Sequence, residues 1–132
     1  MKNLLFLLFF APAALFALPT FQTNPGLDAI NKAISNGDVD ALAKYFDENL
    51  EVSILDEENT YTKAKATEVV KNFFTNNKPK TFTPVHNGSS KGNSDQYCIG
   101  NLTASSGNYR VYIYLKTDGG SVAIKELRFD KE

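Results

Sequence analysis

The histidine content limits the chemistry that this chain can perform. His86 is the only histidine among the 132 residues, so a metal site built from several histidines is excluded. A lone histidine could still act as a general base if it lay in a pocket. Phe82 and Pro84 precede it at alternate positions, and Asn87-Gly88 follows it. We therefore expect a histidine held by a hydrogen bond near a strand end, and we assign no catalytic residue.

Cys98 is the only cysteine, and it could act as a nucleophile only in its thiolate form. A nearby base or helix end would be needed to ionise it, and its neighbours Tyr97 and Ile99 provide neither. We expect Cys98 to be a small apolar residue of the core. An internal disulfide is excluded because the chain has no second cysteine.

The run Asp56-Glu57-Glu58 brings three carboxylates together in the sequence. Hard oxygen ligands suit Ca²⁺, but the run lacks the alternating spacing and the glycine of a dedicated calcium loop. We interpret it as a solvated turn. The sequence thus predicts no metal site and no cofactor.

Alternation in the second half of the chain predicts two unlike sheet faces. The face expected to pack on helices carries Gln96, Cys98, Gly100, Leu102, Tyr109, Val111, Ile113 and Leu115. The opposite face carries Tyr97, Ile99, Asn101, Thr103, Arg110, Tyr112, Tyr114 and Lys116. A mixture of aromatic and cationic residues can be an ordinary solvated face. It is also the composition that is enriched at protein interfaces.

Helical spacing organises the first part of the chain. Leu27, Ile30 and Ile34 fall at i, i+3 and i+7, which predicts one buried helix face. Gly37 is expected to end this helix. Asp38 is a suitable N-cap for a second helix, whose buried stripe we extend to Phe46.

A short strand is predicted over residues 50–54, followed by a turn and a brief return strand. Thr62 can cap a third helix, which has the clearest apolar stripe and ends before Pro79. After Pro79 the apolar residues recur at every second position, which is the spacing of a strand. Four strands joined by glycine-containing turns are predicted to form an antiparallel meander, and they cover residues 82–87, 95–103, 109–116 and 122–129.

This order of elements, with Gly-Asp-Val-Asp-Ala-Leu-Ala-Lys-Tyr-Phe-Asp at residues 37–47, resembles the nuclear transport factor 2-like superfamily. The resemblance covers residues 26–130 and implies an α+β cone with three helices against a strongly bent antiparallel sheet. Segments 82–90 and 109–116 look most like an uncharacterised secreted bacterial family within it. The superfamily also contains enzymes, such as ketosteroid isomerases, polyketide cyclases and scytalone dehydratases. Their sets of catalytic residues do not map onto this chain. The resemblance therefore implies a pocket but no chemistry.

The N-terminus is typical of a secretory signal peptide. Lys2 precedes an apolar run of about 15 residues that Pro12 interrupts, whereas a membrane span needs about 20. We expect residues 1–17 to be removed, with cleavage after Ala13 or Ala14 as the alternatives. Residues 18–25 would form a flexible leader and residues 26–132 one domain. The protein would then be periplasmic or extracellular, with no membrane span. Its mature charge would be about −2, because 13 basic and 15 acidic groups remain, which argues against nucleic-acid binding.

The last predicted strand raises a question of register. Val122 and Ile124 share one phase, but Leu127 and Phe129 share the other. A bulge near Lys125 would return the second pair to the core. We predict an unbulged strand, which places them on the outer face. The predicted interface, for a weak homodimer or an unknown protein partner, is then Ile99, Arg110, Tyr112, Tyr114, Leu127 and Phe129.

Three hypotheses of function follow. We expect a non-enzymatic exported domain that binds a partner or itself. The alternative is a small-molecule pocket inside the cone, lined by Tyr45, Phe74, His86, Gln96 and Tyr109. An isomerase, dehydratase or hydrolase would need His86 or a buried carboxylate in that same cone.

The first testable prediction concerns processing. We expect the mature protein to begin at Leu18, because Ala17 closes the apolar run with a small residue. The intact mass of the protein recovered from the producing cell measures this directly. A mature protein that still carries residues 1–17 would show that the segment is not a signal peptide.

Overall fold

The computed structural model describes residues 25–90, 92 and 94–132. The predicted signal peptide, and the leader up to residue 24, lie outside these residues. The elements are α1 (Pro25–Asn36), α2 (Val39–Ala43), β1 (Phe46–Ile54), β2 (Glu57–Thr62), α3 (Lys63–Asn76), β3 (Pro79–Ser89), β4 (Asp95–Ala104), β5 (Gly107–Asp118) and β6 (Ser121–Lys131). Within the described ranges, no helix is both long and apolar enough to cross a membrane.

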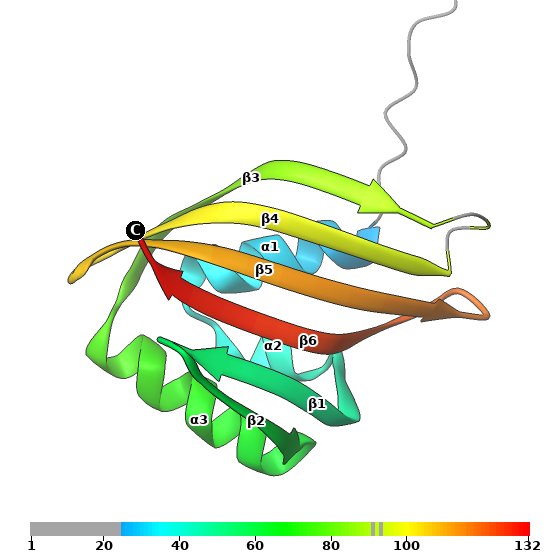
Figure 1. Ribbon diagram of the computed structural model, residues 1–132, viewed down its shortest axis with the longest axis horizontal. Coiled ribbons are helices and arrows are strands. Elements are labelled where there is room, and N and C mark those ends of the chain that lie inside the picture. Colours follow the sequence, from blue (N-terminus) through cyan, green and yellow to red (C-terminus); the bar gives the residue numbers. More distant parts are fainter. Residues whose placement is uncertain (1–24, 91, 93) are drawn as a thin grey trace, which may run out of the picture.

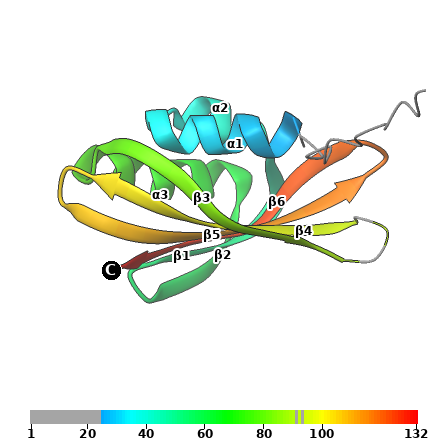
Figure 2. The same ribbon diagram turned by 90° about the horizontal axis from the view of Figure 1, so that it is seen from above.

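The strands form one six-stranded sheet in the order β2-β1-β6-β5-β4-β3. The helices pack on one face of this curved sheet, and among the described residues nothing covers the other face (Figures 1 and 2). The predicted meander of β3 to β6 is confirmed. One pairing was not predicted: β1 lies parallel to β6 and so joins the N-terminal hairpin to the meander.

Both predicted helix caps are confirmed. The Asp38 carboxylate accepts a hydrogen bond from the Ala41 amide, and the Thr62 hydroxyl accepts one from the Lys65 amide. These bonds satisfy amides that the first turn of a helix leaves without partners. Phe46 corrects one detail, because it begins β1 instead of ending α2. It is nevertheless buried.

The core lies between the helices and the sheet. Its part next to α3 is rich in aromatic rings. The ring centroids of Phe73 and Phe129 are 4.7 Å apart, and those of Phe74 and Phe129 are 5.6 Å apart. Tyr109 meets Phe73 edge-on at 5.3 Å. The helix-facing set on β4 and β5 is confirmed from Cys98 to Leu115, all of it buried except Gln96, which is partly exposed.

The unbulged register predicted for β6 is wrong. Tyr114 pairs with Glu126 but Leu115 pairs with Ile124, so Lys125 is an extra residue in the strand. This bulge reverses the side-chain phase. Leu127 and Phe129 therefore lie in the core with 0% of their surface exposed.

The balance of energies explains the bulge. Burying a Leu or Phe side chain contributes about 1.5–3 kcal/mol, whereas one backbone hydrogen bond contributes about 1 kcal/mol. Burying two side chains therefore contributes more free energy than the bulge costs in backbone hydrogen bonds between β5 and β6. The displaced Lys125 is also satisfied, since its ammonium group pairs with the Asp47 carboxylate.

The second prediction tests this burial. We expect Phe129→Ala to lower the free energy of unfolding by about 3–5 kcal/mol, because it leaves a cavity between β6 and α3. Arg128→Ala, one residue away on the outer face, should cost less than about 1 kcal/mol. Urea unfolding of both variants measures the difference. Equal effects would mean that Phe129 does not anchor β6 to α3.

Candidate functional site

The structure does not bring the five predicted pocket residues together. Phe74 and Tyr109 are buried in the aromatic core. The Tyr109 hydroxyl lies 2.9 Å from Asn77 Oδ1 and 2.7 Å from Ser106 Oγ, so its polar end is satisfied. His86 stands on the other face of the sheet. Tyr45 packs at the edge of the core, and Gln96 is partly exposed.

Two hollows open beside the helices. One, of about 370 Å³, lies between the α1–α2 junction and the end of α3, where Asp38 and Lys78 line it. The other, of about 240 Å³, lies between the β1–β2 hairpin and α3, where Tyr61 and Asn76 line it. Among the described residues, the groups with shifted pKa values are Asp47, Glu51, Cys98, Tyr112 and Tyr114. None of these groups lines either hollow.

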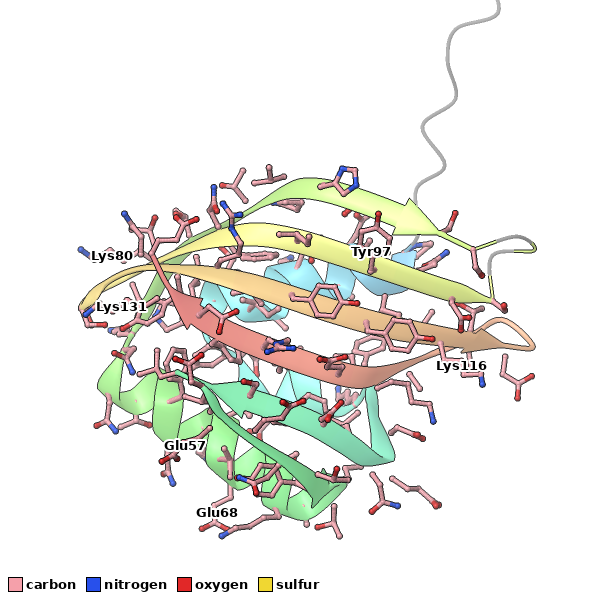
Figure 3. The ribbon with its side chains drawn as sticks, in the orientation of Figure 1. Glu57, Glu68, Lys80, Tyr97, Lys116 and Lys131 are labelled. Atoms are coloured by element: carbon pink, nitrogen blue, oxygen red, sulfur yellow. The ribbon has the colours of Figure 1, made fainter. Side chains whose placement is uncertain are left out.

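Tyrosines from two neighbouring strands gather on the uncovered face of the sheet. Tyr97 of β4 pairs with Tyr114 of β5, and the rings of Tyr97 and Tyr112 stack with centroids 6.4 Å apart. His86 Nε2 lies 3.1 Å from the Tyr97 hydroxyl. Figure 3 shows this face, with Tyr97 labelled on β4. We call Tyr97, Tyr112, Tyr114, His86 and Ile99 the tyrosine surface.

Gly88 makes room for this arrangement. It pairs with Tyr97 across β3 and β4, and a Cβ atom at Gly88 would lie 2.2 Å from Tyr97 Cε1. The ring therefore covers the glycine. The sequence indicated only a turn at Gly88, whereas β3 continues to Ser89. An aromatic residue opposite a glycine is the pattern that could have revealed the contact.

The hydroxyls of Tyr112 and Tyr114 stay protonated at neutral pH. Burial, with a smaller effect of the Glu126 charge, raises the pKa of Tyr112. A hydrogen bond to Asp95 raises the pKa of Tyr114 above its usual value. Both groups are therefore neutral phenols that can donate hydrogen bonds.

Charged residues surround the tyrosine surface. Arg110 Nη2 lies 2.7 Å from Glu132 Oε1, and Arg128 Nη1 lies 3.4 Å from Glu126 Oε1. These pairs are partly exposed, so they contribute little to stability. Of the predicted interface residues, Ile99, Arg110, Tyr112 and Tyr114 occupy this face. Leu127 and Phe129 do not, because the β6 bulge turns them inward.

Cys98 is confirmed as a core residue. It is fully buried, and burial raises the pKa of its thiol to about 11. The thiol is therefore protonated at neutral pH and is a poor nucleophile.

The curved six-stranded sheet with helices on one face defines an α+β protein of the nuclear transport factor 2-like fold. A nuclear transport factor 2-like protein of unknown function from Cytophaga hutchinsonii superposes with a TM-score of 0.58 at 11% identity, covering 87% of this chain and 95% of that chain. This likeness shows the fold alone.

Sequence comparison assigns the chain to a narrower group than the fold does. The domain of unknown function DUF4783 matches residues 27–130, and the chain belongs to this family. A DUF4783 family protein from Bacteroides ovatus is 29% identical with a TM-score of 0.74, covering 79% of this chain and 93% of that chain. One from Bacteroides uniformis is 25% identical with a TM-score of 0.75, covering 80% and 95%. No curated protein matches the chain in sequence.

The third prediction tests the contact between Gly88 and Tyr97. Gly88→Ala should destabilise the protein, because the new methyl group displaces the tyrosine ring. In a Tyr97→Ala background the same change should cost little. We expect a coupling energy of about 0.5–3 kcal/mol between the two sites, measured by urea unfolding of the four proteins. Additive effects would contradict the contact.

Proposed function

We propose that this protein is an exported binding domain that holds a protein partner on its tyrosine surface. Export rests on the N-terminal sequence pattern described above. The binding role rests on one observation: a connected group of aromatic side chains lies on the sheet face that the described helices leave uncovered (Figure 2).

The composition of the surface supports a protein as the occupant. Tyr and Arg are enriched at interface centres, where a rigid ring provides contact area at a low cost in conformational entropy. The stacked rings of Tyr97 and Tyr112 and the bond from Tyr97 to His86 limit the freedom of these side chains before binding. Preorganisation of this kind lowers the entropic cost of association.

The surface is better suited to a different protein than to a second copy. With Leu127 and Phe129 in the core, the face lacks the large apolar patch that typifies obligate homodimers. What remains is aromatic at the centre and charged at Arg110, Glu126 and Arg128. That pattern is typical of non-obligate interfaces.

A small-molecule or enzymatic role has less support. Between α3 and strands β5 and β6, rings pack in mutual contact, namely Phe73, Phe74, Tyr109 and Phe129. The only histidine of the chain lies on the outer face. The interior therefore offers apolar packing where catalysis would need a titratable group.

The fourth prediction tests the binding surface. A photo-crosslinking amino acid that replaces Tyr112 should give one discrete crosslinked adduct in the producing cell. The mass of this adduct should equal that of this chain plus a different protein. The same probe at Glu68, on α3 (Figure 3), should not give that adduct. Tyr97→Ser should weaken the Tyr112 adduct, because it removes the neighbouring ring.

One control and three contradicting outcomes complete this test. The melting temperature of each variant shows whether the fold is kept. An adduct of twice the mass of this chain would identify a second copy and contradict the proposal. Equal adducts from Tyr112 and Glu68, or none from Tyr112, would also contradict it.

A further inference from the structure

Three glutamates from three strands converge at the β1–β2 end of the outer face. Glu51 pairs with Glu126 across β1 and β6, and Glu58 stands on the neighbouring β2. One carboxylate oxygen from each glutamate lies within 4.8 Å of the others. Their sequence positions gave no sign of this cluster, which arises only because β1 lies between β2 and β6.

The cluster holds more negative charge than its surroundings compensate. Among the described residues, Arg128 is the cation that pairs with it, 3.4 Å from Glu126 Oε1. A hydrogen bond to the Glu58 carboxyl raises the pKa of Glu51, and the charges of Glu58 and Glu126 act in the same direction. Carboxylates this close repel one another, and a cation placed between them would relieve that repulsion.

A buried hydroxyl points independently to a ligand at this place. Ser53 is 1% exposed, and its Oγ makes no hydrogen bond. It stands on the same face as Glu51, two residues along β1, and pairs with Glu58 on one side and Arg128 on the other. A buried hydroxyl without a partner costs about 1–3 kcal/mol. Ser53 therefore adds an oxygen donor without a partner to the sheet face that carries the three carboxylates.

We propose that Glu51, Glu58, Glu126 and Ser53 form a binding site for a hard divalent cation, with Ca²⁺ as the ion that fits it best. The donors are all oxygens, which suits Ca²⁺ and Mg²⁺ and disfavours metals that prefer nitrogen or sulfur. Flexible glutamate side chains on a sheet surface match the variable coordination of Ca²⁺ better than the strict octahedron of Mg²⁺. Water would complete the shell. This inference does not depend on the proposed partner.

The fifth prediction is the direct test, by calorimetric titration of the purified protein with CaCl₂. We expect one saturable site with a dissociation constant of about 10⁻⁴–10⁻³ M, the range of weak extracellular sites. Glu58→Gln should weaken binding by at least about tenfold, because ligand charge sets the affinity. Ser53→Ala should weaken it by a smaller factor.

Glu57→Gln is the matched control. Glu57 neighbours Glu58 on β2 but faces the hollow beside α3, so its loss should leave Ca²⁺ binding unchanged. Thermal melting of each variant without Ca²⁺ checks the fold. The proposal fails if no saturable binding occurs up to about 10 mM Ca²⁺, or if Glu57→Gln and Glu58→Gln have equal effects. It also fails if a lysine-rich peptide binds the cluster and Ca²⁺ does not.

Discussion

β6 carries its large side chains on the helix side of the sheet only because Lys125 is an extra residue in the strand. Without that bulge, Ile124 and Phe129 would face opposite sides. The bulge brings both into one core, where Phe129 packs against Phe73 and Phe74 of α3. The apolar layer between α3 and the sheet depends on this change of phase, since Phe129 contacts both aromatic rings of α3 there.

The same change of phase defines the outer surface. With its large apolar side chains turned inward, β6 presents Glu126 and Arg128 to the outside. These residues stand between the tyrosines of β5 on one side and Glu51 and Ser53 of β1 on the other. The outer face is therefore continuous across strands that lie far apart in the sequence. It is aromatic over β4 and β5 and acidic over β1 and β2.

The fold by itself does not determine the chemistry of this chain. A curved sheet with helices on one face can enclose a pocket, but here aromatic rings pack against one another between α3 and strands β5 and β6. Polar groups of the kind that bind partners or ions lie instead on the uncovered face. Function must be argued from that site, because one fold supports many unrelated activities.

Local patterns in the sequence were sufficient for most of the elements. Spacing and caps predicted the helices, since a cap such as Asp38 or Thr62 acts within three residues of itself. Alternation predicted the order of the meander and the helix-facing residues of β4 and β5. The nuclear transport factor 2-like fold was also predicted from the order of elements.

Tertiary structure decided the features that depend on distant residues. The parallel contact of β1 with β6 joins segments about 75 residues apart and has no local signal. It creates the glutamate cluster. The bulge at Lys125 was decided by the energy of burying Leu127 and Phe129, which alternation within one strand cannot weigh. The sequence by itself determined which segments are strands and helices, and packing alone determined which side chains meet.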